Sequence, residues 1–138
     1  MHLDRDEAMR RAISADHGVL ATLNHWGVAD LVPACFAIAG GSLAVPVDSV
    51  KPKRSTALGR IRNLERDPRA TLLVERWDPV DWSRLWWVRL ALVRRDLPGT
   101  VAEALEQGLR DRYPQYAAEP FVALLTFEIE SVAGWSAA

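Results

Sequence analysis

The sequence predicts a mainly β fold with flanking helices, and three observations support this fold class. Six apolar stretches of six to twelve residues are rich in Val, Leu, Ile and aromatic side chains, as in β-strands. Most of them follow one another through short turns instead of alternating with helices, which disfavours a doubly wound parallel sheet. Three other segments carry apolar residues at helical spacing. We therefore expect a six-stranded antiparallel barrel with three helices packed outside it.

The first half of the chain is expected to contain one helix and three strands. Residues 4–15 show helical periodicity, and Asp4 and Glu7 have the spacing of a capping box at its start. The Ala-Gly-Gly of 39–41 predicts a tight hairpin. Pro33 donates no backbone hydrogen bond, so its strand is expected at an edge, at a bulge or facing a ligand. The three strands are expected at 19–24, 28–38 and 42–47.

The second half is expected to contain two helices and three strands. The segment 56–66 has an apolar stripe on one helical face and ends at Asp67. A later helix covers about 101–112, where Thr100 and Glu103 again have capping-box spacing. The three strands are expected at 70–76, 85–94 and 121–132.

Length and charge narrow the function classes. The 138 residues are predicted to form one domain, 1–138, large enough to bury a core of its own. A net charge of −1 gives no overall electrostatic attraction for nucleic acid or an anionic membrane, so neither is expected as a partner. The start of the chain is charged, unlike a signal peptide, and no apolar run approaches the ~20 residues of a membrane helix. We expect a cytoplasmic protein.

The sequence shows no side-chain set typical of metal binding or nucleophilic catalysis. Three histidines lack paired-ligand spacing and are expected as cap or surface residues. Cys35 is the single cysteine and lies in an apolar run, so we interpret it as a buried, inert thiol. Nucleophile-elbow, Walker and dinucleotide-binding motifs are all missing from the sequence.

A basic segment precedes and opens the predicted helix of 56–66. The start of a helix leaves backbone N–H groups unpaired and carries partial positive charge. Cations and hydroxyls beside it form a plausible phosphate cradle, and the alternative is a solvated basic loop. The residues concerned are Lys51, Lys53, Arg54, Ser55, Thr56 and Arg60.

Tryptophan is the second unusual feature, because four of the six tryptophans lie between positions 77 and 87. Side chains alternate along a strand, so Trp86 and Trp87 are expected on opposite faces. One of them would then pack inside while the other meets a partner surface or a flat ligand. Ordinary packing in the core and in a dimer interface is the alternative.

Three stretches together resemble the pyridoxamine 5′-phosphate oxidase-like superfamily. They are HGVLATLN with GVADLVPACFAI, then KPKRSTALGRIRNLERDPRATLLVE, then DWSRLWWVRL, so that the resemblance covers roughly 17 to 95. More narrowly, they are similar to the actinobacterial branch of deazaflavin (coenzyme F420)-dependent oxidoreductases. The resemblance implies an FMN-binding type of split β-barrel, a homodimer and a cofactor in the groove between subunits.

The resemblance also implies roles for individual residues. The six basic and hydroxyl residues named above would hold the cofactor phosphate. Asn63 would either join them or serve as a structural hydrogen bonder. Trp82 and Trp86 would close over the cofactor ring, in one arrangement from the other subunit. The remaining ring-site residues would be Val32, Pro33, Ala34 and Val47.

The implied chemistry needs little from protein side chains, since the cofactor carries the hydride while the protein binds and orients. The leading hypothesis is therefore a dimeric oxidoreductase that uses F420 on a small-molecule substrate, with FMN as the alternative cofactor. Two other hypotheses stay open: a non-catalytic barrel that stores or senses flavin, deazaflavin or haem, and a structural dimer without ligand.

Overall fold

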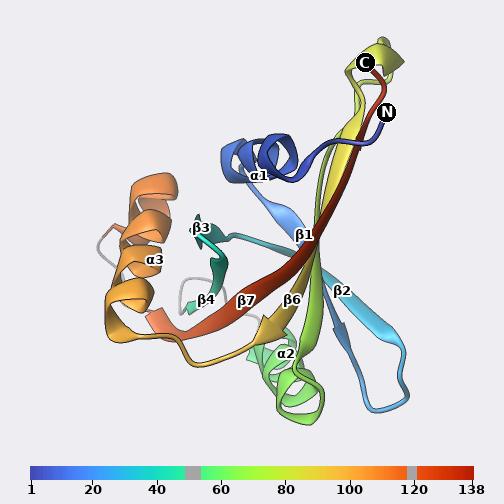
Figure 1. Cartoon of the computed structure of the whole chain (residues 1–138). Helices are drawn as coiled ribbons and strands as arrows, with labels where there is room; N and C mark the ends of the chain where they lie inside the picture. The colour runs from blue at the N-terminus through green and yellow to red at the C-terminus, as the bar shows by residue number, and fades with distance from the viewer. Residues whose placement is uncertain (49–53, 118–120) are drawn as a thin grey trace.

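A computed structural model describes residues 1–48, 54–117 and 121–138 of the chain. Helices lie around one strongly curled sheet (Figure 1). In chain order the elements are α1 (Arg5–Ser14), β1 (Gly18–Leu23), β2 (Ala29–Ala34), β3 (Ala37–Ala39), β4 (Ser42–Asp48), α2 (Arg54–Arg66), β5 (Arg69–Arg76), η1 (Trp82–Arg84), β6 (Trp86–Arg94), α3 (Gly99–Arg112), η2 (Pro114–Tyr116) and β7 (Phe121–Ser136).

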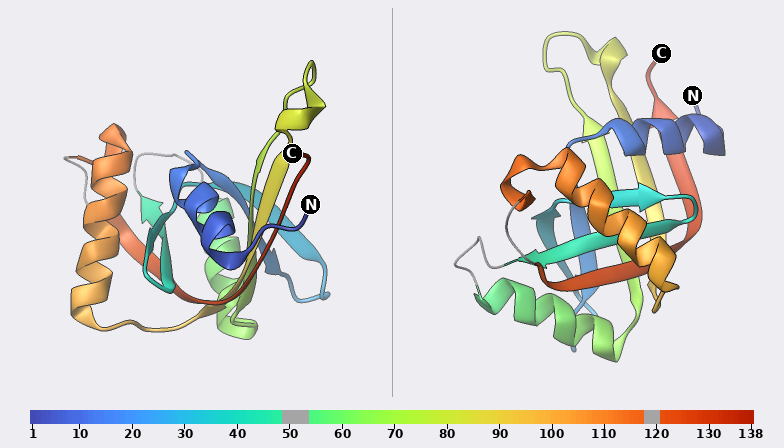
Figure 2. Two further views of the ribbon diagram at one scale, coloured as in Figure 1. Left: turned by 45° about the horizontal axis from the view of Figure 1, so that its top comes forward. Right: turned by 90° about the vertical axis from the view of Figure 1, so that its left-hand side faces the viewer.

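The sheet has the strand order β2-β1-β5-β6-β7-β4-β3, and every neighbouring pair is antiparallel. Strand β7 is long enough to pair with β6 and β4, and it bends between the two halves of the sheet (Figure 2). The two outermost strands, β2 and β3, are consecutive in the chain. The sheet therefore curls until its two ends approach each other, as the predicted antiparallel barrel requires.

The described sheet contains seven strands, whereas the sequence predicted six. The predicted strand of 28–38 is divided at Cys35 and Phe36, where the chain leaves β1 and begins to pair with β4. The last residue of α3 and the C-cap residue that follows it supply hydrogen bonds to the backbone at this point. The Phe36 N–H donates to Tyr113 Oη at 3.2 Å, and the Phe36 carbonyl accepts from Arg112 Nη1 at 3.3 Å. Where the strand breaks, the backbone of Phe36 therefore has hydrogen-bond partners that are distant in sequence.

The inside of the curled sheet is filled by large apolar side chains. Leu20, Leu72 and Leu90 lie on adjacent strands and are 0% exposed, as is Phe127 on β7. Pro33 lies in β2, which is an edge strand as predicted, because β2 pairs only with β1. A second apolar cluster joins α3 to β3 and β4, and it includes Leu105 and Leu109 together with Ala37, Ala44 and Tyr116.

The helix starts agree only partly with the sequence predictions. The capping role of Asp4 is confirmed, because its side chain accepts from the Glu7 N–H at 2.8 Å. The predicted cap at Thr100 is wrong, because α3 begins at Gly99 with Pro98 in the N-cap position and no side-chain cap bond. The Pro98 carbonyl already accepts from two N–H groups, which starts the helix earlier. Helix α2 likewise begins at Arg54, before the predicted start at Thr56.

The turn from α2 into β5 is held by a tight ion pair. The Arg69 guanidinium donates twice to the Asp67 carboxylate, at 3.0 Å from Nε and 2.7 Å from Nη2. These bonds, with one from the Arg69 backbone N–H, lower the pKa of Asp67 from 3.8 to about 2. A depressed carboxyl pKa stabilises the fold above the unfolded pKa, and the contribution is lost as the pH falls through the folded value.

Gly18→Ala is expected to destabilise the fold by about 1–3 kcal/mol, because the new methyl group would overpack the sheet. Its Cβ would lie 2.9 Å from the Leu73 carbonyl oxygen and 3.0 Å from Leu72 Cδ1. Urea unfolding measures the change. Gly41→Ala is the matched control, because no atom lies within 4 Å of its Cβ, and equal stability of the two variants would contradict the packing described here.

Arg69→Gln is expected to raise the pKa of Asp67 from about 2 toward 3.8, because the two guanidinium bonds are lost while the backbone bond remains. Asp67 should then contribute less stability at neutral pH, and the stability lost between the unfolded pKa of 3.8 and the folded value of about 2 should shrink, because the two pKa values become similar. An NMR-detected titration of the Asp67 carboxyl group measures this, with Arg62→Gln on the exposed side of α2 as control. A pKa that stays near 2 in Arg69→Gln would refute the assigned cause.

Candidate functional site

Helix α2 is joined to the sheet by a partly buried polar network. The carboxamide of Asn63 is 4% exposed, and its Nδ2 donates to Thr22 Oγ1 at 3.0 Å and to Asp30 Oδ2 at 2.9 Å. Asn24 Nδ2 donates to the other oxygen of Asp30 at 3.1 Å. The hydrogen bonds from Asn63 and then Asn24 lower the pKa of Asp30, which keeps this carboxylate charged.

The sequence left two roles open for Asn63, a structural one and a cofactor-binding one. The network bears on the first of them. The structure shows the structural role, because both polar contacts of Nδ2 are made within the chain. Cofactor binding by Asn63 stays a prediction.

The predicted phosphate cradle lies at the opposite end of α2. Arg54, Ser55 and Thr56 are in the first turn of the helix, and their side chains lie outside the described part of the chain. Lys51 and Lys53 also lie outside the described residues. Arg60, farther along α2, is half-buried. The first turn of α2 contains no acidic residue, whereas that of α1 contains Asp6 and Glu7.

The four residues predicted to line the ring site are divided between two surfaces. Ala34 and Val47 are 4% and 6% exposed and belong to the barrel core, and Val32 packs against the same core. Pro33 is exposed, pairs with Val19 and faces the other side of the sheet. Within one chain, these residues do not form a single lining.

The two predicted ring-covering tryptophans lie at the far end of the sheet from α2. Trp82 is 65% exposed in η1, at the tip of the β5–β6 hairpin, with its ring centroid 6.0 Å from that of Trp77. The tip projects beyond the body of the protein, near both chain ends, and α2 lies at the other end (Figure 1). Trp86 is half-buried, with the Arg11 guanidinium 5.6 Å from its ring centroid.

The convex face of the sheet carries an apolar surface that the sequence analysis missed. Alternate residues of β1, β2, β5 and β6 point away from the filled core. Leu31 is 63% exposed and Leu73 is 36% exposed, although each belongs to an ordered strand. We call this surface the outer sheet face; it comprises Val19, Ala21, Leu23, Leu31, Pro33, Thr71, Leu73 and Ala91, and the exposed Arg89 lies opposite Leu73 on the same side. The strand alternation in the sequence contained the signal, but only the register shows that these residues are adjacent.

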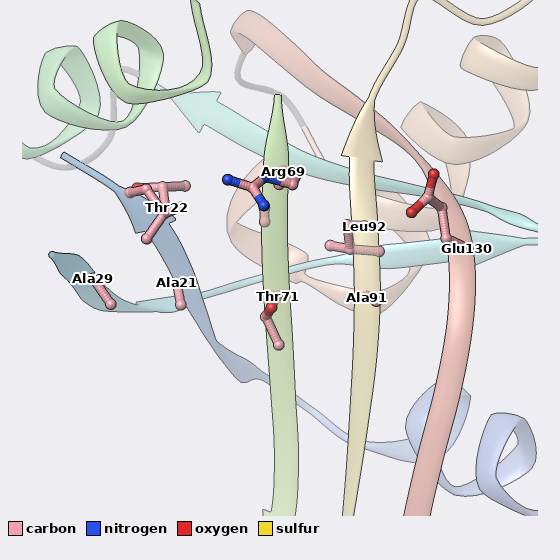
Figure 3. Close-up of a pocket in the computed structure, with 10 residues that line it drawn as sticks. Ala21, Thr22, Ala29, Arg69, Thr71, Ala91, Leu92 and Glu130 are labelled. Atoms are coloured by element: carbon pink, nitrogen blue, oxygen red, sulfur yellow. The ribbon is translucent and has the colours of Figure 1, made fainter. Parts of the chain in front are cut away.

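A hollow of about 330 Å³ opens on this side of the sheet (Figure 3). Small side chains form much of its lining, and the charged groups of Arg69 and Glu130 approach from different strands (Figure 3). The Arg69 guanidinium is fixed by Asp67, as described above. The full lining is Ala21, Thr22, Leu23, Ala29, Arg69, Ala70, Thr71, Ala91, Leu92 and Glu130.

The described residues form neither a metal-binding cluster nor a membrane-spanning helix. No group of three or more His, Cys, Asp or Glu side chains is arranged to hold a metal ion in the described ranges. Within the same ranges, none of the helices has the length and apolar character to cross a membrane.

Cys35, predicted to be buried, is half-buried beside the α3 cluster.

The whole fold matches solved structures at low sequence identity. A conserved hypothetical protein of Mycobacterium tuberculosis, Rv2991, has a TM-score of 0.74 at 18% identity, over 98% of this chain and 86% of that one. A heme-binding protein of Mycobacterium smegmatis has a TM-score of 0.69 at 19% identity, over 95% of this chain and 57% of that one. An FAD-binding protein of Mesorhizobium loti has a TM-score of 0.64 at 17% identity, over 97% and 93%.

Two further solved structures with this fold are named as redox enzymes. An F420 reductase has a TM-score of 0.57 at 17% identity, over 89% of this chain and 94% of that one. A putative pyridoxamine 5′-phosphate oxidase of Corynebacterium glutamicum has a TM-score of 0.58 at 11% identity, over 97% and 90%. Neither a protein-family model nor a curated protein matches the sequence. The chain therefore has the split-barrel fold of the pyridoxamine 5′-phosphate oxidase-like proteins.

Proposed function

We propose that the protein is a homodimeric oxidoreductase that binds the deazaflavin coenzyme F420 between two subunits and transfers a hydride to a small organic substrate. One observation carries the proposal: a helix start without acidic residues follows β4, directly after the basic segment, in a fold that includes an F420 reductase. The cytoplasmic location predicted from the sequence stays a prediction.

The start of α2 has the chemistry that a phosphate group requires. Backbone N–H groups of the first helical turn lack partners within the helix and carry partial positive charge. Lys51, Lys53 and Arg54 add formal charge, while Ser55 and Thr56 offer hydroxyl donors. Because the first turn contains no carboxylate, nothing in that turn competes with a phosphate for these donors. The residues present therefore fit a phosphate-bearing cofactor.

The protein's part in the reaction is binding and positioning. A bound deazaflavin supplies hydride transfer, which explains why the described residues need no nucleophile of their own. The chain would hold the phosphate at α2 and present apolar surface to the ring. Apolar walls exclude water, which strengthens the electrostatic contacts within the site.

Two alternatives have support from particular neighbours. FMN would satisfy the same phosphate cradle, and an FAD-binding protein shares the fold. A non-catalytic binder is the other alternative, since a heme-binding protein has one of the higher TM-scores, 0.69. F420 is preferred here because the segments quoted above most resemble that branch.

The outer sheet face supports a dimer. Leu31 and Leu73 are 63% and 36% exposed on this face of a single chain, and half-buried apolar residues of β1, the strand between theirs, lie beside them. Contiguous exposed apolar surface of this kind marks an interaction site. A second copy is the partner that a homodimer supplies, and the groove along such an interface would give the cofactor contacts from two chains.

Binding of the cofactor is the first test. Titration with oxidised F420, FMN, FAD and haem in parallel, followed by tryptophan fluorescence quenching, should show F420 as the tightest ligand. The experiment needs no substrate. Preference for FMN or FAD would move the protein to the flavin enzymes, and preference for haem would favour storage or sensing. Binding of none of them would refute the proposal.

A double substitution provides the control for this titration. Lys53→Ala with Arg60→Ala should weaken binding by a few kcal/mol if both side chains make charge-assisted bonds to phosphate. Arg62→Ala with Arg66→Ala removes the same charge from exposed positions of α2 and should leave the affinity nearly unchanged. Equal losses in the two variants would mean a general charge effect and would argue against the cradle.

Leu31→Asp with Leu73→Glu should convert the dimer into a monomer, because two carboxylates would be buried in an apolar interface. Sedimentation velocity measures the change, and cofactor affinity should fall in parallel. Ile13→Asp is the control, because Ile13 is 51% exposed on α1, away from the outer sheet face. A wild-type protein that sediments as a monomer would contradict the dimer.

A further inference from the structure

The Asn63 network contains most of the buried polar side chains in the described part of this chain. Among the described residues, only Thr22, Asn63 and Ser136 are buried polar side chains. Two of these three form the direct contact between α2 and β1. Burial of polar groups has a free-energy cost that their hydrogen bonds must offset, so their concentration here calls for a physical reason.

The network fixes α2 in a way that its apolar contacts do not. Leu64 is 3% exposed and Ile61 packs against the core, so both hold the helix near the sheet. Dispersion and hydrophobic contacts are non-directional and tolerate small rotations or shifts of the helix. Hydrogen bonds require distance and angle together. Asn63 reaches Thr22 on β1 and Asp30 on β2, so it fixes the helix against two strands at once.

The strand side of the network is itself held in place. Asn24 donates to Asp30, and the Asn24 carboxamide oxygen accepts from the Trp26 and Val28 backbone N–H groups at 3.0 Å and 3.1 Å. The helix side is fixed as well, because the Asn63 carbonyl accepts from the Asp67 N–H at 2.8 Å at the end of α2. The network is therefore continuous from the β1–β2 turn to the last turn of the helix.

We propose that Asn63, Thr22 and Asp30, here named the helix clamp, position α2 so that its first turn meets the cofactor phosphate; this inference rests on the function proposed above. Arg54 lies nine residues before Asn63 in the same helix, about 14 Å along its axis at ~1.5 Å per residue. A rotation or shift at the clamp is carried by the rigid helix to that first turn. In this proposal Asn63 is a positioning residue that acts through the helix, in place of the direct cofactor contact that the resemblance implied as one alternative.

The test requires a variant that removes the clamp without leaving a buried polar atom unpaired. Asn63→Leu alone would leave the Thr22 hydroxyl, 2% exposed, without its donor. Asn63→Leu combined with Thr22→Val replaces both buried partners by apolar groups of similar shape, which is often close to neutral for stability. Asp30 is exposed and keeps its bond from Asn24, so water can solvate its freed oxygen.

Two readouts are compared between this double variant and the wild type. The first is amide hydrogen exchange of α2 in the ligand-free protein, which should become faster in the variant while the midpoint of urea unfolding stays nearly unchanged. The second is the ratio of affinities for a phosphate-bearing ligand and its phosphate-free counterpart: F420 against its dephosphorylated chromophore, or FMN against riboflavin. The wild-type ratio should fall by about tenfold, the contribution of a charge-assisted hydrogen bond.

Matched controls separate positioning from packing. Ile61→Val trims an apolar contact of α2 and leaves the clamp intact, so the ratio should not change. Thr22→Ser keeps the hydroxyl acceptor and should behave as wild type in both readouts. A double variant that loses phosphate selectivity with intact global stability would establish the clamp.

The remaining outcomes overturn the proposal in distinguishable ways. Unchanged hydrogen exchange of α2 would show that the clamp does not fix the helix, whatever the ligand. Faster exchange with an unchanged affinity ratio would show that helix position does not govern phosphate binding. A wild-type protein without preference for the phosphate-bearing ligand would refute the proposed function itself, and with it the role of the clamp.

Discussion

The structure depends on a two-residue connection between opposite ends of its sheet. Cys35 and Phe36 join β2, the strand at one edge, to β3, the strand at the other. Because the chain from Ala34 to Ala37 can span at most ~11 Å, the sheet must curl until the end of β2 lies near the start of β3. Phe36 is 0% exposed, and α3 satisfies its backbone through Tyr113 and Arg112. The helix packed against β3 and β4 thus helps to close the barrel.

Closure has a direct consequence for function. The interior is filled by Phe36, Phe127 and a layer of leucines, each less than 2% exposed, so the barrel core is a packed interior. A ring-shaped cofactor of the kind proposed above would then have to bind on the outer surface or between chains. The hollow beside Arg69 and the exposed outer sheet face both lie on the convex side, where a second chain has access. The packing that stabilises one chain therefore directs binding chemistry to its surface.

The sequence predicted the strands with regular alternation well. It predicted poorly the features that depend on contacts between residues far apart in the chain. The period-two stretches located β1, β4, β5 and β6 to within a residue or two at each end. The break at Cys35 and Phe36 escaped prediction because the hydrogen-bond partner of the Phe36 N–H is Tyr113, far away in the chain. The ring-site residues showed the same limit: Ala34 and Pro33 are adjacent in sequence, yet one is buried and the other exposed, since successive side chains in a strand face opposite ways. The basic segment was evident from composition, whereas the partners of Asn63 depend on register.

The distance between two parts of one chain bears on whether the proposed cofactor site is built from one subunit or two. The first turn of α2 and the hairpin tip that carries Trp82 lie at opposite ends of the sheet (Figure 1). One small ligand cannot touch both within a single subunit. If the phosphate binds at α2 and a tryptophan of the tip covers the ring, the two contacts must come from different subunits. A twofold axis through the outer sheet face meets this requirement when it places the tip of each subunit beside α2 of the other. In that arrangement, the exposure of Trp77 and Trp82, 58% and 65% in one chain, follows from the need to reach the neighbouring subunit.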